Sequence, residues 1–171
     1  MTDRRRLVVM RHAKAESFGS TDQDRSLTDR GVAAAADAGR RLRDQGLVPE
    51  VALVSTAARA LETWTAARDA AGFAGTELRL DPTLFNAGFE RALETLQALP
   101  EDAGTVMLVG HNPTASYLCH FLDDGAGDPD AVSGLLQGFP PGAFAVLEVP
   151  VPWTDLGAET CRVVGFHVGR G

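Results

Sequence analysis

The feature that most constrains the fold is an apolar run, Leu7 to Met10, that is followed at once by Arg11 and His12. A short apolar run bounded by polar residues predicts a buried strand, central in a parallel sheet. In open α/β sheets, ligands bind at the carboxyl ends of the strands. We therefore expect Arg11 and His12 to lie where such a fold keeps its chemistry.

The same strand-then-helix pattern repeats along the chain. Further strands are predicted at residues 51–54, 77–80, 105–109, 144–149 and 161–166, with 77–80 near a sheet edge. Helices are predicted at about 29–45, after Thr28 as the N-cap, and at 60–71, 89–99 and 113–125. This alternation predicts a three-layer α/β/α sandwich with a mostly parallel sheet. Residues 83–88 and 123–142 are expected to be irregular connections.

Composition indicates one globular domain over residues 1–171, with 44% hydrophobic and 23% charged residues. A net charge of −7 argues against general binding to nucleic acid or to a membrane surface. The basic N-terminus precedes too few apolar residues for a signal peptide, and no stretch approaches the roughly twenty apolar residues of a membrane span. We therefore expect a cytoplasmic protein.

The two cysteines, Cys119 and Cys161, have neither the number nor the spacing of a disulfide framework or a zinc site. They are expected to be reduced and surrounded by apolar residues. No metal and no cofactor is expected. If the ligand is a phosphate, its countercharge must come from individual arginines of this acidic chain.

Two other strand ends carry residues of the same kind. The strand at 51–54 leads to Arg59 at the start of a helix, and the strand at 105–109 leads to His111. Free N–H groups and partial positive charge at helix N-termini favour phosphate. Each residue alone has an ordinary explanation, as a surface arginine or an incidental histidine. Together with Arg11 and His12 they predict a phosphate site in which a histidine can be the nucleophile.

A polar loop, residues 13–27, leaves the first strand and is expected to lie over the site. Lys14 and Arg25 add positive charge there and are candidate substrate contacts. Each could equally be a solvated surface residue. Glu62 stands three positions after Arg59 and is expected to pair with that arginine on the same helical face.

Three segments together resemble the histidine phosphatase (phosphoglycerate mutase-like) superfamily. They are Arg11-His12-Ala13, the stretch 55–63 around Arg59, and Gly110-His111-Asn112-Pro113. The short chain and its Arg-His-Ala-Lys form resemble the SixA-type phosphohistidine phosphatase branch, over roughly residues 7–122. The resemblance implies a phosphoglycerate mutase-like fold.

The resemblance also implies roles for four residues. His12 would be the nucleophile and form a phosphohistidine intermediate, while Arg11, Arg59 and His111 would surround the phosphoryl group. Donors placed in this way can stabilise charge on the equatorial oxygens without a metal. Because one neutral ring nitrogen of His12 must face phosphorus, the other is expected to donate a hydrogen bond, to a backbone carbonyl.

One position departs from the pattern of mutases and phosphomonoesterases in this family. Those members typically carry a glutamate general acid in the loop after the third strand, where this chain aligns Asn86. Asparagine cannot give up a proton, and protonation of an alkoxide leaving group is typically worth ~100-fold or more. An imidazole leaving group needs this help much less. Asp81 or Glu90 could supply the acid instead.

Three functions remain open on the sequence. A metal-independent phosphatase for phosphohistidine in proteins is favoured by Asn86 and by the lack of the long insertions that build a lid over small substrates. A phosphomonoesterase for small metabolites or for phosphoserine and phosphothreonine would need an unrecognised acid. A non-catalytic phosphate-binding module is the third. The sequence assigns no oligomeric state and no role to residues 123–171.

Overall fold

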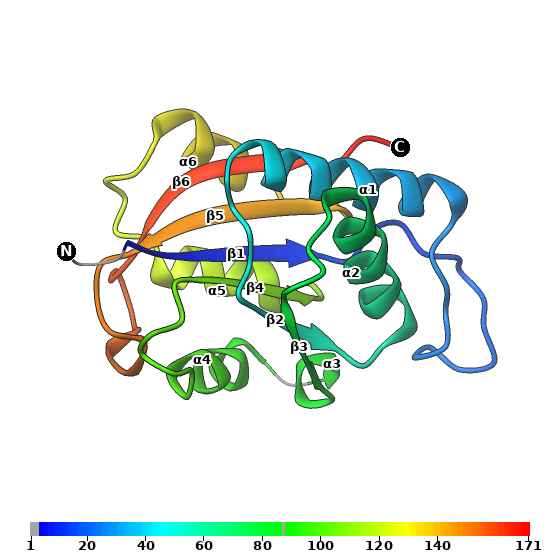
Figure 1. The fold of residues 1–171 in the computed structure, drawn as a ribbon, viewed down its shortest axis with the longest axis horizontal. Coiled ribbons are helices and arrows are strands. Elements are labelled where there is room, and N and C mark those ends of the chain that lie inside the picture. Colours follow the sequence, from blue (N-terminus) through cyan, green and yellow to red (C-terminus); the bar gives the residue numbers. More distant parts are fainter. Residues whose placement is uncertain (1–3, 87) are drawn as a thin grey trace.

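The computed structural model describes residues 4–86 and 88–171. Within these ranges a sheet of six strands lies between two layers of helices (Figure 1). The strands are β1 (Arg5–Arg11), β2 (Val51–Ser55), β3 (Glu77–Asp81), β4 (Thr105–Gly110), β5 (Ala143–Val149) and β6 (Arg162–Val168). The helices are α1 (Asp29–Asp44), α2 (Ala58–Ala71), α3 (Thr83–Asn86), α4 (Phe89–Gln97), α5 (Thr114–Leu122) and α6 (Pro129–Leu136), with a 3-10 turn at Trp153–Asp155.

The strand order in the sheet is β3-β2-β4-β1-β5-β6. The pairings β1 with β4, β4 with β2 and β2 with β3 are parallel, whereas β5 runs antiparallel to β1 and β6 antiparallel to β5. The predictions of a mostly parallel sheet, an interior first strand and a third strand at an edge are confirmed. It follows that the carboxyl ends of β1, β4 and β2 lie next to one another.

The apolar run of β1 is buried because it serves both faces of the sheet. Leu7 and Val9 pack into the core under α4, α5 and α6, while Val8 and Met10 pack into the core under α1 and α2. Alternate residues of a strand point to opposite faces, so a strand covered on both sides must be apolar throughout. The three-layer α/β/α arrangement predicted from the sequence is therefore confirmed.

The two ends of α1 follow local capping signals. α1 has 16 residues and begins after Thr28, whose Oγ1 accepts a hydrogen bond from the N–H of Gly31 at 3.0 Å, as predicted for an N-cap. Gly46 follows its end in the left-handed region, with φ at +71°. No helix in the described ranges combines the length and the apolar character needed to cross a membrane.

Two segments predicted to be irregular contain helices, so those predictions are wrong. Within residues 83–88, α3 starts where Oδ1 of Asp81 accepts from both the N–H and the hydroxyl of Thr83. Within residues 123–142, α6 starts where Asp128 accepts from the N–H of Ala131, with a proline at the first helical position. Both helices are too short for apolar periodicity to reveal them, and capping alone marks their starts.

Helices α1 and α2 approach each other closely at Gly39. A Cβ built on this glycine would overlap the backbone carbonyl of Ala67 in α2, a residue that is itself fully buried. Glycine therefore sets the distance between the two helices that cover one face of the sheet.

We predict that Gly39→Ala lowers the free energy of unfolding by about 1–3 kcal/mol, because the added methyl group must push α1 away from α2. Gly75→Ala is the matched control, since a Cβ there meets nothing within 4 Å. The control should stay within roughly 0.5 kcal/mol of the wild type. Urea denaturation measures both changes, and equal stability of Gly39→Ala and wild type would contradict the close approach.

Candidate active site

The predicted site residues lie at the adjoining carboxyl ends of β1, β4 and β2 (Figure 1). Arg11 ends β1 and His12 follows it, His111 follows β4, and Arg59 lies in the first turn of α2. The His12 and His111 ring centroids are 5.2 Å apart, and Phe85 contacts both His111 and Arg59. The chain leaves β1 toward α1 on one face and β4 toward α5 on the other, which is where open sheets hold ligands.

His12 is held by the backbone around it. Its Nδ1 lies 2.7 Å from the carbonyl oxygen of Ala13. Its backbone N–H donates to the carbonyl of Gly110, and its backbone carbonyl accepts from the N–H of Gly142. Burial lowers the pKa of His12 to about 4, and the positive charge of Arg59 acts in the same direction. The ring is therefore neutral at pH 7. Because a carbonyl only accepts, Nδ1 carries the proton and Nε2 keeps its lone pair, as expected of a nucleophile.

Among the described residues, His111 is hydrogen-bonded at one of its two ring nitrogens. Its Nε2 lies 2.8 Å from Oγ of Ser55, and its ring packs against the Phe85 ring in a T-shaped contact, with the centroids 5.6 Å apart. Its Nδ1 is buried and has no partner among the described residues. Burial lowers the pKa of His111 to about 3, followed by the effects of His12 and Arg59. His111 is therefore also neutral at pH 7.

Arg59 is buried at 7% exposure although it carries a charge. Its Nη1 donates to the carbonyl of Asp22 at 2.8 Å, and its Nη2 lies 3.4 Å from the carboxylate of the same residue. The guanidinium also stacks over the Phe85 ring at 5.6 Å. The cation is thus held beside the two histidines by a residue of the loop that leaves β1.

Arg11 is positioned by a segment for which no role is predicted from the sequence. Its Nη1 donates to the carbonyl of Phe139 at 3.0 Å, and Nδ2 of Asn112 donates to the same oxygen at 2.9 Å. Nε of Arg11 is buried and has no hydrogen-bond partner in the described part of the chain. Burial lowers the pKa of Arg11, but a guanidinium stays charged at neutral pH. One backbone carbonyl between α6 and β5 therefore orients side chains from the ends of both β1 and β4.

Thr63 is a further residue of the site, for which no function is predicted from the sequence. It is fully buried, donates to the carbonyl of Arg59 at 2.6 Å and accepts from the N–H of Ala13 at 3.0 Å. Its hydroxyl thus joins the first turn of α2 to the backbone next to His12.

The two predicted substrate contacts, Arg25 and Lys14, have different surroundings, and the positive charge of Arg25 also lowers the pKa of His12. Arg25 pairs with Asp22 at 2.8 Å and donates to the carbonyl of Glu16, and the carboxylate of Asp22 also pairs with Arg59. The side chain of Lys14 is exposed. The predicted pairing of Glu62 with Arg59 is wrong, because Glu62 accepts from the N–H of Leu27 at 2.6 Å instead.

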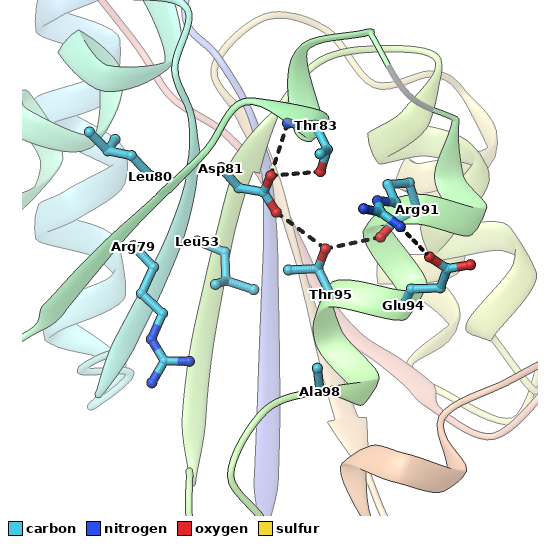
Figure 2. A pocket seen from close by; sticks show the side chains of 9 residues that line it. All are labelled: Leu53, Arg79, Leu80, Asp81, Thr83, Arg91, Glu94, Thr95 and Ala98. Carbon is cyan, nitrogen blue, oxygen red and sulfur yellow. Dashed lines mark hydrogen bonds and ion pairs between the residues drawn. The ribbon is translucent and has the colours of Figure 1, made fainter.

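Three residues near the end of β3 bear on the question of a general acid. Asn86 is exposed at the end of α3 and follows Phe85, which touches His111 and Arg59. Figure 2 shows Asp81 between Thr83 and Thr95, where its two carboxylate oxygens accept from both hydroxyls. Glu90 is exposed in the first turn of α4.

The cavity beside Asp81 has a volume of about 410 Å³ and lies between β3 and α4. Arg79 and Arg91 line it, and each is paired with a glutamate, Glu77 or Glu94. The lining carries neither histidine of the site. Asp81 is therefore engaged in capping α3 and in contacting α4.

In residues 4–86 and 88–171, no group of three or more His, Cys, Asp and Glu side chains is close enough to hold a metal ion.

Comparison with known proteins identifies the family. The model of the histidine phosphatase superfamily (branch 1) matches residues 7–91. An uncharacterised protein of Mycobacterium leprae (strain TN) is 34% identical over 168 residues, which cover 94% of this chain and all of the relative.

Two solved structures share the fold over nearly the whole chain. One, from Nakamurella multipartitia and provisionally assigned as the phosphohistidine phosphatase SixA, is 34% identical, with a TM-score of 0.84 over 97% of this chain and 96% of that one. Another, from Agrobacterium tumefaciens and with the same provisional assignment, is 30% identical, with a TM-score of 0.79 over 96% and 97%. The chain therefore belongs to the histidine phosphatase superfamily, in its SixA-type branch, and is a phosphatase whose substrate carries a phosphoryl group.

Proposed function

We propose that this protein removes phosphate from phosphohistidine in other proteins, without a metal, through a phosphohistidine intermediate on His12. The observation that carries the proposal is the free Nε2 lone pair of a neutral His12, with His111 5.2 Å away and Arg59 buried beside them. The relatives provisionally assigned as phosphohistidine phosphatases support the choice of substrate. We place its action in the cytoplasm, on the sequence arguments given above.

In the first step, Nε2 of His12 attacks phosphorus in line with the leaving group. A P–N bond to His12 forms as the bond to the substrate nitrogen breaks. Arg11, Arg59 and His111 are proposed to donate to the equatorial oxygens, where charge accumulates. The substrate imidazole departs as a neutral ring when its other nitrogen is already protonated, so the breaking bond needs no proton from the protein.

In the second step, water attacks the phosphoryl group on His12. The P–O bond to water forms, the P–N bond to His12 breaks, and inorganic phosphate leaves. The hydrogen bond from Nδ1 to Ala13 holds the ring in one orientation through both steps. The carboxylate of Asp22 pairs with both Arg25 and Arg59, and so it holds Arg25 beside the proposed phosphoryl site. In this scheme the carboxylate moves away from Arg59 when the phosphoryl group binds.

The position of Asn86 favours a phosphoramidate over an ester. It follows Phe85, which touches two of the proposed phosphoryl-binding residues, so residue 86 stands next to the site. An amide there gives no proton to an alkoxide. Asp81 is held by two threonine hydroxyls, which weakens it as the alternative acid. Ester hydrolysis as the main activity would require an acid at one of the remaining positions, such as Glu90.

The nucleophile is tested by His12→Ala, which should reduce turnover of a phosphohistidine-bearing protein by roughly 1,000-fold or more. The assay contains EDTA, and full activity is expected in its presence. His120→Ala, in an exposed position of α5, is the matched control and should retain wild-type turnover. Mass spectrometry should find an acid-labile phosphoryl group on His12 of the wild type. Undiminished turnover by His12→Ala would exclude this mechanism.

The substrate class is tested by Asn86→Glu, which should raise hydrolysis of a phosphoserine peptide by about 10- to 100-fold relative to phosphohistidine. The side chain of Asn86→Gln has the same length as that of the glutamate variant but carries no acid. It should therefore leave the ratio of phosphoserine to phosphohistidine hydrolysis unchanged. Phosphoserine turnover by the wild type that equals its phosphohistidine turnover would favour the ester phosphatase. In that case the variant of Glu90 or Asp81 that loses the high-pH limb of the pH–rate profile identifies the acid.

The protonation state is tested by an NMR titration of His12. The pKa of about 4 predicts a neutral ring above about pH 5, whereas in urea-unfolded protein the pKa should return to about 6.5. Between about pH 4 and pH 6.5, His12 therefore binds more protons in the unfolded chain than in the folded protein. The free energy of unfolding should consequently fall as the pH drops from about 6.5 toward 4. A folded-state pKa near 6.5 would contradict the burial argument.

A further inference from the structure

Ser55 contacts the site although no motif assigns it a role. It is the last residue of β2 and is fully buried. Its hydroxyl lies 2.8 Å from Nε2 of His111, which comes from the neighbouring strand end, and 3.3 Å from the backbone nitrogen of Ala57. The hydroxyl thus stands between a backbone donor and an imidazole whose proton can be on either nitrogen.

The two contacts of the hydroxyl decide where its proton goes. The N–H of Ala57 is a donor, so Oγ accepts from it and keeps its own proton for another group. Nε2 of His111 is the acceptor available to this proton among the described residues. Leaving a buried hydroxyl proton unbonded is costly. Ser55 therefore donates to Nε2, and the proton of the neutral His111 ring belongs on Nδ1.

We propose that Ser55 is a positioning residue that fixes the Nδ1–H tautomer of His111 and so turns this histidine into a hydrogen-bond donor toward the phosphoryl group. Nδ1 is buried and has no partner in the described residues, which fits a donor whose acceptor arrives with the substrate. The identity of that acceptor rests on the proposed function. The tautomer itself rests only on the contacts of Ser55.

The same contacts disfavour a cationic His111. Protonation of Nε2 would make the ring donate to Ser55, and the serine proton would then lose its acceptor. His111 is thereby kept as a neutral donor, which stabilises charge but is a far weaker acid than an imidazolium. A site with such a residue suits a leaving group that departs unaided, as the imidazole of phosphohistidine does. Ser55 therefore contributes to the choice of substrate without touching it.

The tautomer is measured directly by long-range proton–nitrogen NMR of the folded protein at pH 7, with no substrate present. His111 signals are assigned by their disappearance in His111→Gln. We expect the protonated-nitrogen shift on Nδ1 and the bare-nitrogen shift on Nε2. A protonated Nε2 in the wild type would overturn the inference, whatever the protein hydrolyses.

Variants of Ser55 test the cause. Ser55→Ala removes the donor to Nε2, so the fixed tautomer should be lost and the pKa of His111 should rise. If Ser55 instead accepted from Nε2, the pKa would fall. Ser55→Thr keeps the hydroxyl and should restore the wild-type tautomer, and Ser133→Ala, at an exposed position of α6, should leave it unchanged. The charged groups around His111, which are Arg11, Arg59 and Asp22, and its neighbour His12 are the same in all these variants.

Turnover separates this inference from the proposed function. With phosphohistidine as the substrate, Ser55→Ala should lower kcat by about 10-fold with little change in KM, and Ser55→Thr should recover most of it. Unchanged kcat in Ser55→Ala would overturn the positioning role. If the wild type hydrolyses no phosphohistidine but His111 shows the Nδ1–H tautomer, the proposed function fails and the tautomer assignment stands.

Discussion

The site depends on the parallel pairing of β1, β4 and β2. This pairing brings three strand ends together, and with them two imidazoles and two guanidinium groups. The two imidazoles would repel each other and the guanidinium groups if they were protonated. They are also poorly hydrated, since His12 and His111 are each 8% exposed. Desolvation then lowers the pKa of both rings, so that both are neutral at pH 7. The architecture of the sheet thus sets the charge state on which nucleophilic chemistry by a histidine relies.

Much of this arrangement could be predicted from sequence, because apolar runs mark the strands and polar residues follow them directly. His12, His111 and Arg59 were placed correctly at their strand and helix ends for that reason. The partners of these residues were harder to predict. A carbonyl such as that of Phe139 has no side-chain signature, and the loop carrying Asp22 has no periodicity, so Arg59 was paired with Glu62 in error. The short helices α3 and α6 were missed because only capping residues signal them.

The site is rich in donors and poor in acids. Its positive charge is local in a chain of net charge −7, and Asp22 balances part of it by contacting both Arg25 and Arg59. The hydroxyls of Ser55 and Thr63 act on the site through other groups, one through an imidazole and one through backbone atoms. Under the proposed function, such a site would stabilise a phosphoryl group and give little help to a poor leaving group. The proposed selectivity for phosphohistidine therefore depends on the absence of a general acid as much as on the hydrogen-bond donors that are present.

The carbonyl of Phe139 has a consequence for how the protein is made. Every motif residue lies before position 114, yet Arg11 and Asn112 are oriented by this later carbonyl, and His12 accepts from Gly142. β5, which follows directly, pairs with β1 in the interior of the sheet. A chain emerging from the ribosome N-terminus first thus carries all the chemistry-bearing residues before it has a working arrangement of them. The contacts that orient Arg11, Asn112 and His12 are complete only once β5 has joined the sheet.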